Sequence, residues 1–540
     1  MAVIRKVIIQ NYKQFKNLSI DFNPDVNIIV ADNENGKSTL FEAIHLALSG
    51  KINNKPLLQE LTPYLFNIEC IKEYIQQLKD TTSQDVILPP SLLIELYFQD
   101  EDNDELAQYK GTNNSLKENA TGLKIGLVFD DDYLEEYKQY IRNPQEVTTI
   151  PIEYYKTEWW SFAFSPIKYA LLPIKSLLID NISTKFSNGV DKFVTTTIED
   201  ILEKKDNVAL SLKYRQLKQS FSSDENITKI NQQLSNLDKD ITDKNMNISV
   251  DISSKSSWDM ALSLYLDEIP FNFMGKGEQN SIKAKLSLKT KTDKYKVILI
   301  EEPETNQSYS NMSKLINFIT KNCSEKQIFI STHSSYVLNK SGIDKAIFLN
   351  QGNVLKLNEL TKDTYEYFKI LPGYDTLRLI LSKKSFLVEG PSDELIIQAA
   401  YKKKYSKLPI EDGIDVICVR GLSFLRFLEI ADKLDKDVTV FTDNDGDYEN
   451  NIKKKYQQYE NHQHIKVAYS TNNSWNTLEP QIAYINKINT LCTVLSLDEK
   501  RYDNNDKISE WMQKNKTDSA LRIYTQSSLI NFPEYINNGL

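Results

Sequence analysis

The chain has 540 residues, more than one hydrophobic core normally organises, so about three or four domains are expected. Its apolar and charged fractions are those of a globular protein, its formal net charge is −9, and no stretch approaches the roughly 18 consecutive apolar residues of a membrane span. The first residues lack the apolar core and cleavage site of a secretion signal, so we expect a cytoplasmic protein without membrane partners.

A nucleotide-binding motif is predicted near the N-terminus, where the apolar run Val26 to Val30 precedes a polar loop and a helical pattern from Lys37. In the P-loop template G-x-x-x-x-G-K-[ST], backbone N–H groups hold phosphates, the lysine reaches the β and γ oxygens and the hydroxyl holds Mg²⁺. Gly36, Lys37 and Ser38 match this template, whereas Ala31 stands at its first glycine position. The pattern predicts an ATP site, with Mg²⁺ at Ser38, formed by Asn33, Glu34, Asn35, Gly36, Lys37, Ser38 and Thr39.

The middle of the chain, from about Asp191 to Ser249, is polar with intermittent helical spacing. It does not sustain the apolar heptads of a long coiled coil. A short helical insert that serves dimerisation fits this pattern.

A second part of the ATP site is predicted at Val297 to Ile300, an apolar run that resembles a Walker B strand and precedes two acids. Glu301 is expected near Mg²⁺, and Glu302 is expected to polarise the attacking water. A buried strand followed by two solvated acids is the alternative. The presence of Lys37 upstream favours the ATPase interpretation.

Two further motifs are typical of the ABC/SMC branch of ATPases. The stretch "FMGKGEQNSI" resembles the signature motif and supplies Gly275, Lys276 and Gly277, while His333 follows an apolar strand as a switch histidine does. In that branch the signature of one subunit closes over the ATP of another, which implies a homodimer or higher homo-oligomer of heads. The structural alternatives are an ordinary turn at the glycines and, at His333, a polar side chain whose hydrogen bonds are made within the fold.

A cluster of acids is predicted in the last third of the chain. The apolar run Phe386 to Val388 precedes Glu389, and the run Val438 to Phe441 precedes Asp443 and Asp445. Carboxylates crowded in this way repel one another and are usually compensated by a divalent cation. An EF-hand loop fails on spacing, and a haloacid-dehalogenase-like phosphotransferase leaves Glu389 unexplained. A TOPRIM metal site uses both segments, because the carboxyl ends of parallel strands share one edge of a sheet.

This combination resembles the OLD (overcoming lysogenisation defect) family, in which an ABC/SMC-like, Rad50-like P-loop ATPase head with a helical dimerisation insert precedes a TOPRIM Rossmann-like α/β domain. The resemblance implies an ATPase segment with the Walker A motif at residues 1–175, a helical insert at 176–258, a second ATPase segment at 259–380 and a TOPRIM nuclease domain at 381–540. It implies two Mg²⁺ or Mn²⁺ ions at the TOPRIM site and one Mg²⁺ with ATP. The TOPRIM residues it implies are the metal ligands Glu389, Asp393, Asp443, Asp445 and Glu479 and the basic residue Lys516.

The resemblance implies an ATP-binding endonuclease that cleaves DNA and defends bacteria against phage, in a Gabija-like or retron-associated setting. The partners implied are DNA and a second copy of the chain, with a helicase-like protein or a retron reverse transcriptase with its RNA–DNA hybrid as defence partner. The alternative is a DNA-binding, SMC-like ATPase scaffold with an inactive TOPRIM domain. Activation and restraint of cleavage by ATP are both compatible with the motifs, as are DNA and RNA targets.

Overall fold

The computed structural model describes residues 3–52, 55–80, 86–99, 104–168, 172–180, 186–187, 190–191, 202–237, 247–250, 258, 264–291, 295–322, 325–370, 374–419 and 423–540. Internal contacts divide the chain into a main unit, Met1–Ile174 with Gln327–Leu540, and a middle unit, Lys175–Lys326. The boundaries of the four expected segments stay a prediction. Among the described residues, no helix has the length and apolar character needed to cross a membrane.

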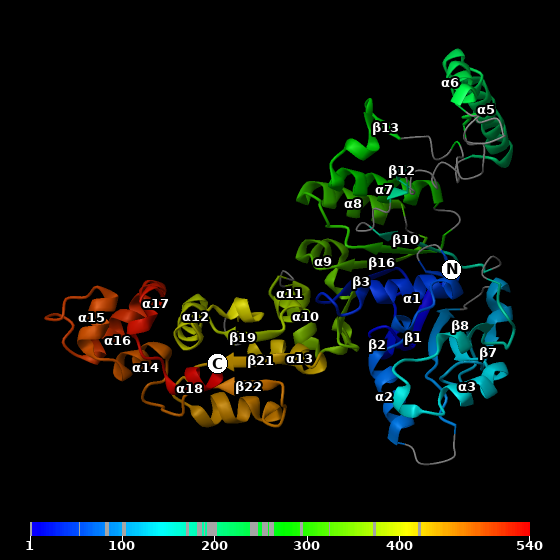
Figure 1. Ribbon diagram of the computed structural model, residues 1–540. Coiled ribbons are helices and arrows are strands. Elements are labelled where there is room, and N and C mark those ends of the chain that lie inside the picture. Colours follow the sequence, from blue (N-terminus) through cyan, green and yellow to red (C-terminus); the bar gives the residue numbers. More distant parts are fainter. Residues whose placement is uncertain are drawn as a thin grey trace. The chain divides into compact units, whose positions relative to one another are not determined.

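The main unit begins with an antiparallel sheet in the order β2-β1-β6-β8-β7, with β9 also paired to β8. β1 and β2 form a hairpin, since they pair antiparallel across a turn. Helix α1 packs against β6 and β8 of this sheet (Figure 1). The elements are β1 (Val3–Tyr12), β2 (Phe15–Asp21), α1 (Lys37–Ser49), α2 (Ile68–Asp80), β6 (Leu92–Gln99), β7 (Lys110–Gly111), β8 (Ala120–Phe129), α3 (Leu134–Tyr140) and β9 (Tyr155–Ser161), with the short pair β4 (Lys51–Ile52) and β5 (Lys55–Pro56).

The P-loop strand lies in a second sheet of the main unit. β3 (Val26–Val30) pairs in parallel with β16 (Gln327–Thr332) on one side and β17 (Ala346–Asn350) on the other, and β18 (Asn353–Lys356) pairs antiparallel with β17. Every residue of β16 and β17 is buried, and their central residues, Ile328 to Ile330 and Ala346 to Leu349, are apolar, as in strands covered on both faces. The helices α9 (Ser335–Ser341), α10 (Lys362–Ile370) and α11 (Tyr374–Leu381) follow.

The TOPRIM region contains a four-stranded parallel sheet in the order β20-β19-β21-β22, which confirms the predicted parallel arrangement. The strands are β19 (Lys384–Val388), β20 (Ile414–Cys418), β21 (Asp437–Phe441) and β22 (Ile465–Ala468). Residues alternate between two cores, as the period of two along a strand requires. Phe386 and Phe441 pack with α12 (Pro391–Tyr405), whereas Leu387 and Val440 pack with α13 (Phe424–Lys433).

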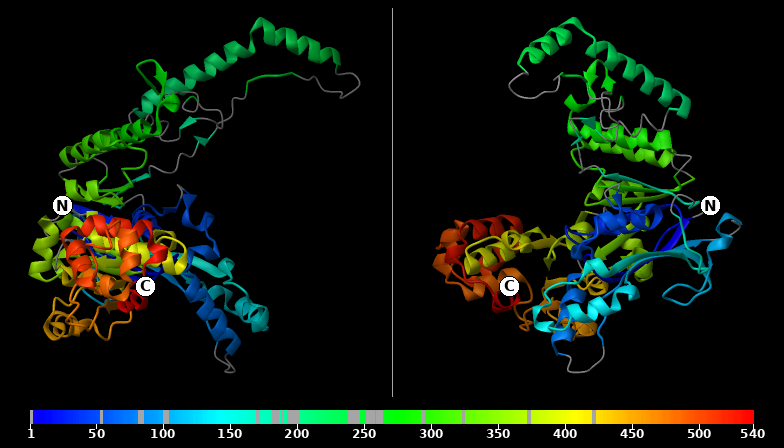
Figure 2. Two further views of the ribbon diagram at one scale, coloured as in Figure 1. Left: turned by 90° about the vertical axis from the view of Figure 1, so that its left-hand side faces the viewer. Right: turned by 45° about the vertical axis from the view of Figure 1, so that its right-hand side comes forward.

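The two cores extend to different parts of the chain. The α12 side is completed by α14 (Leu478–Ile485), α15 (Ile488–Leu495), α16 (Asn505–Lys514), α17 (Lys516–Thr525) and α18 (Glu534–Gly539). The α13 side shares its core with Val30, Phe348 and Leu377, which belong to β3, β17 and α11. The TOPRIM sheet and the P-loop sheet are therefore joined by one hydrophobic core, and the helices on both faces of the TOPRIM sheet can be followed in Figures 1 and 2.

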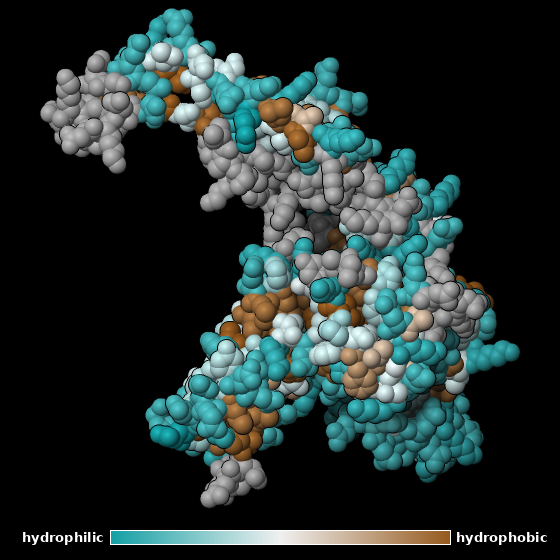
Figure 3. All heavy atoms as spheres, turned by 90° about the vertical axis from the view of Figure 1, so that its right-hand side faces the viewer, coloured by the Kyte–Doolittle hydropathy of each residue, from teal (hydrophilic) through white to brown (hydrophobic). Residues whose placement is uncertain are grey.

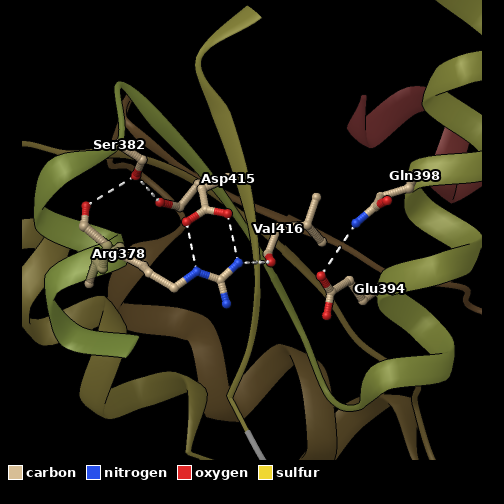
Figure 4. A network of polar contacts seen from close by, with 8 residues as sticks. Arg378, Ser382, Glu394, Gln398, Asp415 and Val416 are labelled. Carbon is tan, nitrogen blue, oxygen red and sulfur yellow. Dashed lines mark hydrogen bonds and ion pairs between the residues drawn. The ribbon is translucent and has the colours of Figure 1, made fainter. Parts of the chain in front are cut away.

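An arginine anchors the TOPRIM sheet to α11. Arg378 donates from Nε to Asp415 Oδ2 at 2.9 Å and from Nη2 to Asp415 Oδ1 at 2.7 Å, and Nη2 also donates to the carbonyl of Val416 at 2.7 Å (Figure 4). Such a two-pronged contact fixes both partners in orientation. It ties β20 to the helix that leads into β19.

The middle unit contains the parallel pair β10 (Ser176–Asp180) and β15 (Val297–Glu301) and the contacting helices α7 (Lys276–Lys291) and α8 (Tyr309–Asn322). The predicted helical insert is represented by α5 (Lys204–Ser222) and α6 (Glu225–Leu237); the rest of the insert lies largely outside the described residues. Short pairs complete the unit: β11 (Phe186–Ser187) with β12 (Val190–Asp191), and β13 (Tyr265–Leu266) with β14 (Ile269–Pro270). Hydrophilic residues predominate on the face drawn in Figure 3, where hydrophobic residues form separate patches.

Candidate functional site

The P-loop of the main unit is shaped by its backbone and by the neighbouring hairpin. Gly36, at the start of α1, has a φ of 96°, and a Cβ built on it would lie 2.2 Å from the ring of Phe15. Gln14 donates from Nε2 to the carbonyl of Glu34 at 3.0 Å and accepts from the hydroxyl of Thr39 at 3.3 Å. Glycine is therefore required for both backbone conformation and space, and no local sequence pattern indicated the support from Gln14.

The P-loop lysine is held at the centre of the loop. Lys37 is 6 % exposed, and its Nζ donates to the carbonyl of Ala31 at 2.8 Å and to that of Asp32 at 3.2 Å. His333, at the end of β16, places Nδ1 3.4 Å from the same Nζ. The predicted switch histidine and the predicted phosphate-binding lysine thus lie side by side.

The P-loop also contacts the strand that leads toward the TOPRIM region. Asn35 lies 3.4 Å from Asn350 at the end of β17, and Asn350 donates to the carbonyl of Leu434 after α13 at 2.8 Å. Asn33 donates its backbone N–H to Asp32, and Ser38 is exposed at the start of α1. A separate cavity of about 430 Å³ lies beside Asp32 of the P-loop, and its lining also includes His333, Arg378 and Asp415.

The other predicted ATPase residues belong to the middle unit. Glu301 ends β15 and is 7 % exposed, and Glu302 follows with a φ of 39°. Gly277, near the start of α7, has no room for a side chain, because a Cβ would lie 1.9 Å from the carbonyl oxygen of Asn306. The signature segment therefore packs against the loop that follows the Walker B strand, whereas Gly275 lies in open space and Lys276 is exposed.

The acids of the TOPRIM region follow the carboxyl ends of β19 and β21. Glu389 Oε1 accepts from the hydroxyl of Thr442 at 2.9 Å and from the backbone N–H of Asp443 at 3.3 Å. Asp393 caps its own helix by accepting from the N–H of Gly390 at 3.0 Å. These contacts bring the two predicted acidic segments together.

The turn after β21 is fixed by an asparagine that sequence reasoning had passed over. Asn444 is fully buried, donates to the carbonyls of Ser470 at 2.8 Å and Asn472 at 3.2 Å, and accepts from the N–H of Gly446 at 2.9 Å. Asp445 consequently has a φ of 48° and is exposed. The sequence does contain a signal for this role, because Asn444 stands between two aspartates in a loop. A loop exposed to solvent needs no buried amide, so an asparagine at this position can indicate a side chain that fixes the turn.

The acids are close enough to raise one another's pKa. Burial raises the pKa of Asp443 to about 8, and the charges of Glu389, Asp393 and Glu479 add to the effect. Burial also raises the pKa of Asp393 to about 6, again with contributions from Glu389 and Glu479. The cluster therefore carries more negative charge than its surroundings stabilise.

A lysine lies beside this cluster. Lys516, the first residue of α17, places Nζ 3.3 Å from Glu479 Oε1. Burial lowers the pKa of Lys516, but Glu479, Asp393 and Asp443 outweigh it and raise the pKa overall. The predicted basic residue therefore lies beside the acids.

Tyr535, on α18, is a further neighbour of the acids that the sequence did not indicate. Burial, followed by the charges of Asp443, Asp393, Glu389 and Glu479, raises the pKa of its hydroxyl well above the usual range. Tyr535 also lines a cavity of about 10 Å³ with Glu389, Asp393 and Asp443. That volume is close to one water-sized sphere.

Asp447 belongs to the next turn. Its carboxylate accepts from the backbone N–H of Asn450 at 3.1 Å and from the side-chain amide of Asn450 at 2.6 Å. It is exposed. We assign it a capping role.

The donor set suits a hard divalent cation. Its members supply carboxylate oxygens, the ligands that Mg²⁺ prefers, and Glu479 Oε2 is buried with no hydrogen-bond partner among the described residues. In the part of the chain that the structure describes, no three Asp, Glu, His or Cys side chains already meet in metal-binding geometry.

Comparison with protein families identifies the two regions. One family model described as an AAA domain matches residues 6–242, and another described as an AAA ATPase domain matches residues 178–338. The model of the "Overcoming lysogenization defect protein-like, TOPRIM domain" matches residues 380–445, which include β19, α12 and the acids through Asp445. The chain therefore combines matches to AAA ATPase domains with a following OLD-like TOPRIM domain. The TOPRIM interpretation is thereby confirmed over the EF-hand and dehalogenase-like alternatives.

Solved structures similar to this OLD-like protein include ATPase heads. The Smc head domain of Pyrococcus furiosus bound to the C-terminal domain of ScpA is 13 % identical, with 68 % of this chain and 100 % of that chain covered and a TM-score of 0.35. The SMC head domain of Thermotoga maritima is 11 % identical, covering 66 % and 98 %, with a TM-score of 0.28. The recombination mediator RecF is 12 % identical, covering 66 % and 98 %, with a TM-score of 0.34. No curated protein matches the sequence.

Proposed function

We propose that this protein is an ATP-binding, divalent-metal-dependent endonuclease that cleaves phosphodiester bonds of DNA at the TOPRIM acids. The observation that carries the proposal is the convergence of Glu389, Asp393 and Asp443 on one small cavity at the carboxyl ends of β19 and β21, inside the region that matches the OLD-like TOPRIM model. Carboxylates this close repel one another, and a purely structural turn would gain nothing from that repulsion.

Each residue has a role in this proposal. Glu389, Asp443 and Asp445 hold the metal ions, with Asp393 and Glu479 as further ligands. The hydrogen bond from Thr442 orients Glu389. Lys516, whose Nζ reaches the cluster through Glu479, stabilises the charge that develops on the phosphate. Divalent ions at such a site activate water and stabilise the leaving oxygen.

The nucleotide role rests on the P-loop. The backbone N–H groups before α1 and the ammonium of Lys37 bind the phosphates, Ser38 holds Mg²⁺, and His333 senses the γ-phosphate beside Lys37. Glu301 and Glu302 complete the site as metal ligand and water-polarising group. Asn33, Glu34 and Thr39 shape the loop, and Gly275, Lys276 and Gly277 contact the ATP of a second subunit.

A homodimer or higher homo-oligomer is part of the proposal. The helices α5 and α6 expose large apolar side chains, among them Val208 at 70 %, Leu217 at 65 % and Phe221 at 57 % exposure. Apolar faces of this kind mark interaction sites. Sedimentation of the full chain with and without ATP measures the assembly; a monomer under both conditions contradicts it.

The test of the nuclease is incubation of the purified protein with plasmid and Mg²⁺ or Mn²⁺, with and without ATP. Nicked or linear products are expected from the wild type and not from the double variant Asp443→Ala/Asp445→Ala. The ATP arm shows whether nucleotide promotes or restrains cleavage. ATP turnover without cleavage of DNA or RNA would favour the scaffold alternative.

A defence role against phage, Gabija-like or retron-associated, follows from the OLD-like resemblance. The test is phage plating on bacteria that express the gene with its neighbouring genes. Protection is expected for the wild type and not for Asp443→Ala. Equal plating on both would contradict the role while leaving the nuclease chemistry intact.

A further inference from the structure

A cavity of about 480 Å³ opens beside the TOPRIM acids, at the end of the edge strand β22. Its walls include Tyr469, Ser470, Trp475, Gln481 and Tyr535. Tyr535 also lines the small cavity of the acids, so the two spaces share a wall. The volume is that of a small-molecule site.

A buried amide lines this cavity. Gln481, on α14, is 5 % exposed, and its Nε2 has no hydrogen-bond partner among the described residues. Leaving a buried donor without a partner destabilises a fold, so such groups are rare and usually meet a ligand, a water or an ion. The amide is suited to donate to an oxygen or nitrogen acceptor that enters the cavity.

Aromatic rings are already paired at the wall. Trp475 stacks on Tyr484 with ring centroids 4.7 Å apart and planes 16° apart, and Tyr469 lies 5.5 Å from Tyr448. Ordered aromatic pairs offer flat faces on which a further ring can stack. The cavity therefore combines a stacking surface with a buried amide whose Nε2 has no hydrogen-bond partner among the described residues.

The cavity wall and the acidic turn are one structure. The carbonyls of Ser470 and Asn472, both on the wall, accept the two hydrogen bonds from Asn444, which lies between Asp443 and Asp445. A group bound in the cavity is thus held in fixed relation to the acids. The charged side chains on the wall, Lys466 and Glu534, are of opposite sign, which favours a neutral occupant.

We propose that this cavity binds an unpaired nucleobase of the strand that is cut at the TOPRIM acids. Trp475 supplies the stacking face, and the amide of Gln481 donates to the edge of the base, which makes Gln481 a determinant of base preference beside the cut. This inference rests on the proposed nuclease function and adds a substrate feature to it: a nucleotide with its base turned out of any duplex.

The test compares Gln481→Leu and Trp475→Ala with the wild type and with Gln513→Leu, the same substitution at an exposed position of α16. Binding of short fluorescein-labelled single-stranded DNA and RNA is measured by anisotropy in EDTA, and cut positions are mapped in Mn²⁺. We expect Trp475→Ala to weaken binding roughly tenfold or more. We expect Gln481→Leu to erase a base preference at one position beside the cut without lowering thermal stability, and Gln513→Leu to behave as the wild type.

The outcomes separate the two proposals. Unchanged affinity and cut pattern in both cavity variants overturn the base pocket and leave the nuclease standing. Cavity-dependent binding by a wild type that never cuts overturns the nuclease and retains the pocket. A large loss of thermal stability in Gln481→Leu makes the amide structural and overturns its role. A wild type that neither binds nor cuts nucleic acid overturns both proposals. Comparison of the DNA and RNA substrates shows which nucleic acid supplies the base.

Discussion

The P-loop and the TOPRIM cluster are suited to ligands of opposite charge, and they are built from different parts of the chain. The P-loop is one contiguous segment that presents backbone N–H groups and a lysine to an anion, and its lysine is held by the carbonyls of Ala31 and Asp32. The TOPRIM cluster gathers carboxylates from the ends of two strands and from α14 around a space suited to a cation. The first depends on backbone shape, the second on side chains that repel one another.

This difference determines how each region should respond to mutation. A backbone-made site tolerates changes of loop side chains but not loss of Gly36 or Lys37. A cluster of repelling acids loses its metal when one acid is removed, yet the metal-free fold is relieved of charge. The two regions should therefore differ in the sign of the stability change that accompanies loss of function.

The largest effect is expected at the acids. Asp445→Ala removes a proposed metal ligand and should lower the rate of metal-dependent cleavage on the order of a thousandfold, since metal stabilisation of the transition state contributes several kcal/mol. The rate of plasmid nicking in Mn²⁺ measures it. Asp447→Ala, in the same exposed loop, is the matched control and should cut as the wild type does. Equal losses of activity in both variants would contradict the assignment of Asp445 to the proposed site.

A smaller effect is expected in the P-loop. Lys37→Ala removes a charged hydrogen-bond donor, worth about 1.5–3 kcal/mol, and should weaken ATP binding roughly 10- to 100-fold. Titration with a fluorescent ATP analogue measures it, with Lys16→Ala as a surface control because Lys16 pairs with Glu73 in solvent. Unaltered ATP affinity in Lys37→Ala would contradict the P-loop assignment.

The meeting of acids at the ends of strands could be predicted from the sequence. Glu389 and Asp443 follow short apolar runs, and parallel pairing alone brings such ends together, as β19 and β21 show. The residues that support the two sites could not be predicted. Tertiary contacts, which leave no local sequence pattern, bring Gln14, Asn350 and Tyr535 to these sites. Asn444 was visible in the motif, but its role depends on the carbonyls of a later loop.

Asn444 therefore offers a test of the support around the acids. Asn444→Ala removes three hydrogen bonds inside the fold and should cost about 1–3 kcal/mol of stability, which is about 2–4 °C in Tm per kcal/mol for a domain of this size. Thermal unfolding in EDTA measures it. Exposed Asn473, which accepts one hydrogen bond from Tyr448, is the matched control as Asn473→Ala. If both variants melt together with the wild type, the buried amide does not hold the turn.

The last prediction concerns the pH dependence of the metal-free protein. The folded protein keeps the proton of Asp443 up to about pH 8, whereas the unfolded chain releases it near the ordinary value of 3.8. Between these values the folded state binds more protons, so the free energy of unfolding falls as pH rises, by up to about 1.4 kcal/mol per pH unit for this group, and levels off above about pH 8.

Asp443→Asn removes this titrating group without changing the shape of the side chain. Measured by guanidinium unfolding in EDTA, the advantage of the variant over the wild type should grow between pH 5 and about pH 8 and be larger by more than about 1 kcal/mol at pH 9 than at pH 5. Mn²⁺ should reverse the order at pH 9, because only the carboxylate binds the ion. Parallel stability curves for the two proteins would show that the acids do not repel one another in the fold, and the TOPRIM region would then differ from the P-loop in composition alone.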